Sequence, residues 1–122
     1  MSKHIMVVDD SKTIRNLLAF IIKSEGFKVT AAEDGLDGLE KLYSAETVDL
    51  IVCDVNMPRM DGFTFIKTLR EQDAYKDVPI IVLSTEGQEK DIAMGMNLGA
   101  NMYMVKPAEP AKMIRNIKML LG

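Results

Sequence analysis

The chain alternates between short apolar runs and longer segments in which apolar residues recur every three or four positions. The apolar runs predict five strands, at residues 5–8, 28–32, 50–53, 80–83 and 102–105. Strands that alternate with helical segments are typical of a parallel α/β sheet. No repeat, low-complexity tract or linker interrupts the pattern, and 122 residues suffice for one hydrophobic core. We therefore expect a single domain over residues 1–122.

Each strand is followed by a segment with apolar residues on one helical face. These residues are Ile14, Leu17, Leu18, Ile21 and Ile22 in the first segment, Leu36, Leu39, Leu42 and Tyr43 in the second, Phe65, Ile66 and Leu69 in the third, Ile92, Ala93 and Met96 in the fourth, and Met113, Ile114, Ile117, Leu120 and Leu121 in the last. Asp34 is expected to cap the second helix, and Gly99 to end the fourth. His4 has no partner in sequence, so we expect it on the surface.

Five strands joined by crossover helices predict a doubly wound sheet, for which we expect the flavodoxin-like strand order 2-1-3-4-5. Ligands bind such sheets outside the carboxyl ends of the strands, near the point where the strand order reverses. Polar residues follow four of the predicted strands there. They are Asp9 and Asp10 after the first, Asp54 after the third, Ser84 after the fourth and Lys106 after the fifth.

Three carboxylates close together repel one another unless a cation neutralises them. An oxygen-only ligand set without histidine suits Mg²⁺, or alternatively Mn²⁺, and not Zn²⁺. Such a site fits phosphoryl transfer, in which Asp54 can act as the nucleophile. Lys106 and the Ser84 hydroxyl would then each hold a phosphoryl oxygen.

The net charge of −3 gives no indication of a nucleic-acid-binding face. No apolar run approaches the roughly 20 residues that cross a bilayer, and residues 1–8 lack the features of a signal peptide. The single cysteine, Cys53, cannot form an internal disulfide and is expected in a buried strand. We therefore expect a cytoplasmic protein, by default a monomer, that binds neither nucleic acid nor membrane.

Four motifs, MVVDDS, CDVNMPRMDG, VLST and MVKP, stand in this order and spacing along essentially the whole chain. Together they resemble the receiver domain of two-component response regulators, and the NMPRMDG stretch is most similar to CheY-like chemotaxis regulators. The resemblance implies that Asp54 is the phosphoacceptor and that Mg²⁺ is held by Asp10 directly, by Asp9 mainly through water, by Asp54, and by the Asn56 backbone carbonyl. Lys106 would pair with the phosphoryl group, which Ser84 would follow inward.

The resemblance also assigns residues around this centre. Tyr103 matches the aromatic residue that turns inward on activation, and Asn56 and Glu86 match positions that help to set the rate of phosphate hydrolysis. Pro107 matches the proline that follows a cis peptide bond. Two residues depart from the family pattern: Thr85, where many relatives have alanine or glycine, and Ala108, where phenylalanine is common. Ala108 leaves the identity of the output partner open.

The leading interpretation is a signalling switch without turnover of an external substrate. A histidine kinase would phosphorylate Asp54, and an effector such as a flagellar motor switch component would bind the altered surface. A phosphorelay intermediate that passes the group to a histidine phosphotransfer domain is the near alternative. A Mg²⁺-dependent phosphatase with an aspartyl-phosphate intermediate is the alternative of another class. Such enzymes carry a second aspartate as general acid at the position that Asn56 occupies here.

Overall fold

The computed structural model describes residues 2–44 and 47–122. Within them, strands and helices alternate along the sequence. Their bounds are β1 (His4–Val8), α1 (Lys12–Lys23), β2 (Lys28–Ala32), α2 (Gly35–Ser44), β3 (Leu50–Cys53), α3 (Gly62–Arg70), β4 (Ile80–Ser84), α4 (Glu89–Leu98), β5 (Met102–Val105) and α5 (Pro110–Leu121). None of the helices in this part of the chain is long and apolar enough to cross a bilayer.

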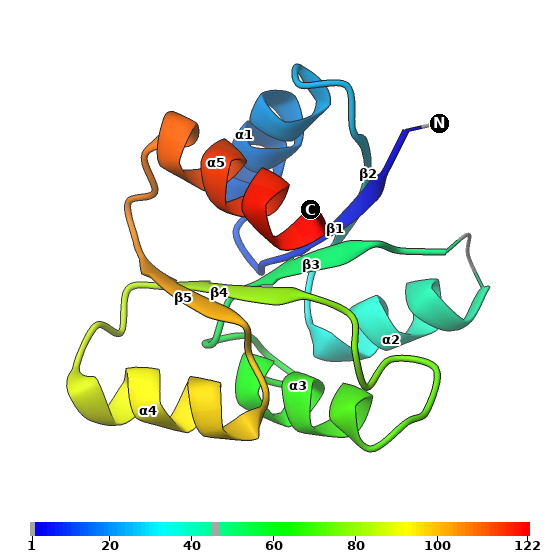
Figure 1. Cartoon of the computed structure of the whole chain (residues 1–122). Coiled ribbons are helices and arrows are strands. Elements are labelled where there is room, and N and C mark those ends of the chain that lie inside the picture. The colour runs from blue at the N-terminus through cyan, green and yellow to red at the C-terminus, as the bar shows by residue number, and fades with distance from the viewer. Residues whose placement is uncertain (1, 45–46) are drawn as a thin grey trace.

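The strands form one parallel sheet in the order β2-β1-β3-β4-β5, which confirms the predicted fold. Helices α1 and α5 cover one face of the sheet, and α2, α3 and α4 cover the other (Figure 1). The strand order reverses at β1, which lies between β2 and β3. The carboxyl ends of β1 and β3 are therefore neighbours at the point where such sheets bind ligands.

The central strands are buried on both faces, and alternate side chains enter two separate cores. Met6 and Val8 of β1 pack on the side of α2 and α3, where Phe65 and Leu69 are fully buried. The intervening residues of β1, Ile5 and Val7, belong to the core beneath α1 and α5. Because the side chains of β1 alternate between the two faces, the register of β1 also sets the directions of Asp9 and Asp10, which follow it.

Several expectations about individual side chains are wrong. His4 is only 7 % exposed, because β1 begins at this residue and lies between two neighbouring strands. Its ring nitrogens contact the Thr30 hydroxyl at 2.7 Å and the Thr47 carbonyl at 3.2 Å. Four large residues expected on the apolar faces of their helices are exposed instead: Leu17, Leu36, Tyr43 and Met96. The apolar stripes of these helices are wider than the strips that the sheet covers.

Other predicted details hold. Asp34 precedes α2, and its carboxylate accepts a hydrogen bond from the Asp37 amide at 2.9 Å, as a helix cap does. Gly99 ends α4 with a φ of 116°, in the left-handed region where glycine has no steric penalty.

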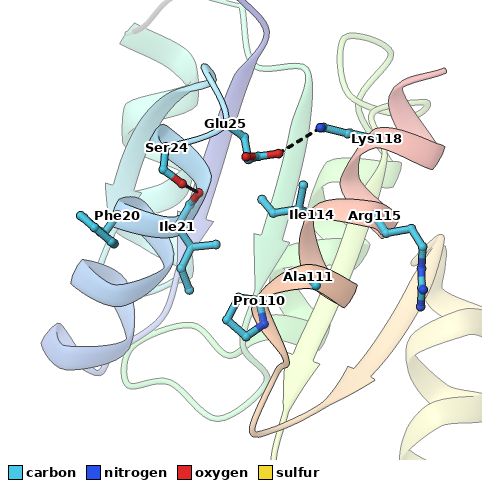
Figure 2. A pocket seen from close by; sticks show the side chains of 9 residues that line it. All are labelled: Phe20, Ile21, Ser24, Glu25, Pro110, Ala111, Ile114, Arg115 and Lys118. Carbon is cyan, nitrogen blue, oxygen red and sulfur yellow. Dashed lines mark hydrogen bonds and ion pairs between the residues drawn. The ribbon is translucent and has the colours of Figure 1, made fainter.

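A groove with a volume of about 650 Å³ separates the exposed sides of α1 and α5. Phe20 and Ile21 line it from α1, and Ile114 lines it from α5 (Figure 2). An ion pair between Lys118 and Glu25, 3.0 Å long, spans it (Figure 2). None of the polar residues at the strand ends lines this groove.

Candidate functional site

The three acidic residues predicted at the strand ends do come together. Val8 of β1 pairs with Cys53 of β3, and the Asp54 amide donates to the Val8 carbonyl at 2.8 Å. Asp9 and Asp54 therefore leave adjacent strands side by side. Asp9, Asp10 and Asp54 each offer one oxygen, and these three oxygens lie within 4.8 Å of one another. Asp9 and Asp54 are buried, and Asp10 is exposed.

Lys106 brings the positive charge. It follows β5, and its Nζ lies 2.9 Å from Asp9 Oδ2 and 3.5 Å from Asp54 Oδ2. The Lys106 backbone amide donates to the Ser84 carbonyl at 2.8 Å, which continues the pairing of β4 with β5 beyond Val105. The peptide bond between Lys106 and Pro107 is cis.

One ammonium group does not balance three carboxylates. Burial raises the pKa of Asp54, and the Asp9 carboxylate raises it further, although Lys106 and the Val55 amide partly offset these effects. Burial alone would lower the pKa of Lys106, but its hydrogen bond with Asp9 and the charge of Asp54 outweigh this and raise it. The excess negative charge and the oxygen-only donor set fit a hard divalent cation such as Mg²⁺.

Ser84 is fully buried at the end of β4, and its hydroxyl accepts a hydrogen bond from the Glu86 amide at 3.0 Å. No hydrogen bond joins this hydroxyl to Asp54 or Lys106 in the described residues. The structure thus places Ser84 beside the carboxylates on a neighbouring strand, but its hydroxyl is engaged with its own loop.

Asn56 and Glu86 lie on two different loops that border the carboxylates. We call residues 54–61 the β3–α3 loop and residues 85–88 the β4–α4 loop. The Asn56 side-chain amide donates to Glu86 Oε1 at 3.2 Å, so a contact between these two exposed side chains bridges the loops. The sequence placed both residues at the site but gave no sign that they touch.

Tyr103 of β5 is half-buried, and its hydroxyl donates to the backbone carbonyl of Glu86. Its ring lies against α4, where a Cβ added to Gly95 would come within 3.1 Å of the ring. Burial raises the pKa of Tyr103. The amide and the carbonyl of Glu86 are therefore held by Ser84 and by Tyr103, respectively.

Four further residues took no part in the predictions for the site. The Asp9 carboxylate accepts a hydrogen bond from the Ser11 amide at 2.9 Å, and Arg15 donates to the Asp9 backbone carbonyl at 2.7 Å. Arg15 lies about one helical turn into α1, which begins shortly after Asp9. This position is the only feature of the sequence that could have indicated the contact. Arg59 binds the Asp34 carboxylate through two nitrogens. No sequence pattern joins those two residues, which are 25 positions apart.

The residues that depart from the family pattern lie to one side of the carboxylates. Thr85 is exposed, and Ala108 packs against the core beneath α1 and α5. Both line a pocket of about 320 Å³, together with Leu17 of α1 and with Lys106. The small side chain at position 108 thus lies in the same pocket as Lys106.

Comparisons with known proteins agree with this geometry. The family model for the response regulator receiver domain matches residues 5–118. The transcriptional regulatory protein PhoP of alkaline phosphatase synthesis in Bacillus subtilis is 39% identical over 99% of this chain, which spans about half of that regulator (49%). The chemotaxis protein CheY1 of Helicobacter pylori is 33% identical over 97% of this chain and 96% of its own length.

Solved structures show the same architecture. The chemotaxis protein CheY4 of Vibrio cholerae superimposes with a TM-score of 0.92, at 35% identity, over 98% of this chain and 99% of that one. The family match covers every strand end at which the acidic residues, Ser84 and Lys106 lie. The chain therefore belongs to the response regulator receiver domain family and is CheY-like.

Proposed function

We propose that this chain is a phosphorylation switch in which Asp54 accepts a phosphoryl group from a phosphohistidine of a histidine kinase. The observation that carries the proposal is the convergence of Asp54 with two further carboxylates and with Lys106 at one edge of the sheet. An Asp54 oxygen would bond to phosphorus as the phosphorus–nitrogen bond of the donor breaks. The electron pair of that bond stays on the imidazole nitrogen, which takes up a proton.

The residues at the site have distinct tasks in this proposal. Asp10 and Asp54 would hold Mg²⁺ directly, Asp9 mainly through water, and the Asn56 backbone carbonyl would complete the protein ligands. When bound, the cation supplies positive charge to the phosphoryl oxygens. Lys106 is already within 3.5 Å of Asp54 and would pair with another of these oxygens. The positive charges thus lower the cost of placing a doubly charged group beside carboxylates.

The switch would act through the backbone of Glu86. Ser84 and Tyr103 each hold one polar group of this residue. If the Ser84 hydroxyl turns to a phosphoryl oxygen, it releases the Glu86 amide and loosens the loop that Tyr103 holds. Phosphorylation would then shift an existing equilibrium between two surfaces formed by α4, β5 and α5.

The identity of the phosphoacceptor can be tested by incubating the chain with Mg²⁺ and acetyl phosphate and measuring intact mass. The wild-type chain should gain one phosphoryl group, and Asp54→Ala should gain none. Asp61→Asn is the matched control, because Asp61 is a loop carboxylate that caps α3 and asparagine also caps helices well. Persistent labelling of Asp54→Ala would defeat the assignment.

We propose a short-lived phosphoprotein, because Asn56 and Glu86 match the positions of chemotaxis regulators and lie in contact at the site. The decay of the labelled form should be followed by mass after the donor is removed. A phosphoryl lifetime of many hours would contradict the proposal.

The output is proposed to be a protein partner in the cytoplasm, with chemotaxis as the setting. The similarity to chemotaxis proteins along nearly their whole length supports this choice. A pull-down with the beryllofluoride-activated chain should recover a flagellar switch protein. Recovery of a histidine phosphotransfer domain, with transfer that outruns hydrolysis, would instead support a phosphorelay intermediate.

A further inference from the structure

The β3–α3 loop is anchored at a point remote from the phosphoacceptor. Asp34, between β2 and α2, is 2 % exposed. Its carboxylate accepts hydrogen bonds from Arg59 Nε at 2.7 Å and from Arg59 Nη2 at 3.0 Å. A two-point guanidinium–carboxylate pair fixes orientation as well as distance. The end of β2 is thus tied to a loop that leaves β3, although β1 separates these two strands.

A second bond runs beside this pair. The Gly35 amide donates to the Met60 carbonyl at 3.1 Å. A Cβ added to Gly35 would lie 2.7 Å from Met60 Cγ and 2.9 Å from the Met60 carbonyl oxygen, so the two segments approach as closely as a glycine allows. The backbones at Gly35 and Met60 therefore contact each other directly.

Arg59 adopts a backbone conformation that a side chain does not favour. Its φ of 62° lies in the left-handed region, where a non-glycine residue is held by its surroundings. The surroundings here are the buried Asp34 carboxylate, whose pKa is lowered chiefly by the Arg59 hydrogen bonds. Without Arg59 this carboxylate would lose two charge-assisted hydrogen bonds, which gives the pair a reason to persist.

We infer that Asp34 and Arg59 are positioning residues, which hold the Asn56 carbonyl where the cation needs it. This inference rests on the proposed function. The Gly62 amide donates to the Val55 carbonyl at 2.8 Å, which joins the two ends of the loop. Towards its C-terminal end, Arg59 and Met60 are held to Asp34 and Gly35. Asn56 lies between Val55 and Arg59, so its carbonyl has little freedom while both anchors are intact.

The test measures Mg²⁺ affinity by titration calorimetry, without a phosphodonor, on Asp34→Asn and Arg59→Gln. Asparagine at position 34 keeps the cap on α2. Each change should weaken Mg²⁺ binding about fivefold, less than the loss of a direct partner of a metal ligand causes. The double variant should bind no more weakly than the weaker single variant, because both changes release the same anchor.

The direction in which Arg59→Gln changes Mg²⁺ affinity distinguishes a positioning role from a simple effect of charge. Removal of a positive charge by itself should tighten the binding of a cation, whereas release of the loop should weaken it. Lys118→Gln is the matched control, since it breaks the exposed Glu25 pair far from the site and removes the same charge. This control should change Mg²⁺ affinity less than twofold, because exposed charges more than about 10 Å apart are screened at 0.1 M salt.

Hydrogen exchange of the Mg²⁺-free proteins gives a readout that does not depend on the metal. The amides of residues 56–60 should exchange faster in both single variants, with β4 and β5 unchanged. Arg59→Gly should behave like Arg59→Gln, although glycine relieves the left-handed strain.

Unchanged or tighter Mg²⁺ binding by Arg59→Gln, with wild-type exchange in residues 56–60, would overturn the inference. If the wild-type chain bound no Mg²⁺ and gained no phosphoryl group, the proposed function itself would fail.

Discussion

The two loops at the carboxylate cluster are held in opposite ways. The β3–α3 loop is fixed by backbone contacts at Gly62, by the Asp61 cap on α3 and by the Asp34–Arg59 pair. The β4–α4 loop consists of exposed residues, and the Gln88 side chain makes no capping bond to α4. Among the described residues, Glu86 holds this loop by hydrogen bonds with Ser84, Tyr103 and Asn56. Its last residue, Gln88, accepts hydrogen bonds from the first turn of α4 through its backbone carbonyl. A fixed loop suits the side of the site that we propose to hold a cation, and a weakly held loop suits the side that we propose to change.

Glycine substitutions should show the largest difference between the loops. In Gly62→Ala, the new Cβ would lie 2.0 Å from the Asp54 carbonyl oxygen, which belongs to the backbone and cannot yield. We expect a loss of about 3 kcal/mol or more in the free energy of unfolding. In Gly87→Ala, the new Cβ meets only the Val105 side chain, at 3.2 Å, and the loss should stay below about 1 kcal/mol. Urea denaturation measures both; equal losses would contradict the comparison.

Asp54 begins the β3–α3 loop, and its charge should reduce stability without a cation. Its raised pKa means that the folded chain holds the proton more tightly than the unfolded chain, so stability falls as the pH rises from the unfolded value of about 3.9 through the folded value. In EDTA at neutral pH, Asp54→Asn should therefore be more stable than the wild type by on the order of 1 kcal/mol. The gain should vanish below the unfolded pKa.

Mg²⁺ provides the control for this prediction. It should raise the unfolding midpoint of the wild type more than that of Asp54→Asn, because ligands that bind only the folded state stabilise it. A stability gain of Asp54→Asn that persists in full at low pH would show that the charge of Asp54 is not its cause.

The helix caps should give a smaller difference. Asp61 accepts from the Thr64 amide at 2.8 Å, so Asp61→Ala should cost about 1 kcal/mol. Gln88 occupies the same position before α4 without a capping bond, and Gln88→Ser should add about 0.5 kcal/mol. Thermal unfolding should show a lower midpoint for Asp61→Ala and a higher midpoint for Gln88→Ser than for the wild type. A gain from Gln88→Ser that also slowed exchange in residues 85–88 would sharpen the comparison.

Tyr103→Phe should have the smallest effect on stability. It removes one hydrogen bond to the Glu86 carbonyl at a partly exposed site, which corresponds to about 0.5 kcal/mol. Its effect should instead appear as faster hydrogen exchange of residues 85–88, with residues 54–61 unchanged. Equal acceleration in both loops would mean that they are not restrained independently.

The fold and the carboxylate cluster were predictable because they depend on local patterns. A buried parallel strand is apolar throughout and ends where Asp9, Asp54 or Lys106 begins, so the strand pattern alone places these residues at one edge. The burial of His4 was not predictable in this way. It depends on Thr30 and Thr47, which only the pairing of strands brings near.

The contacts that restrain the two loops could not be predicted from the sequence either. The Asp34–Arg59 and Asn56–Glu86 contacts join side chains 25 and 30 positions apart, with no periodicity to connect them. The exposure of Leu17 was missed for a different reason. The heptad-like spacing shows that a helix has an apolar face but not how much of that face a sheet will cover.

The ion pair between Lys106 and Asp9 joins residues 97 positions apart. Once translation has passed Asp54, the nascent chain contains every carboxylate of the cluster but not the Lys106 ammonium group. That group arrives only with β5, which must still dock along β4. The site is thus incomplete in a nascent chain until translation has passed position 106, because its carboxylates lack the ammonium group that pairs with Asp9 and Asp54.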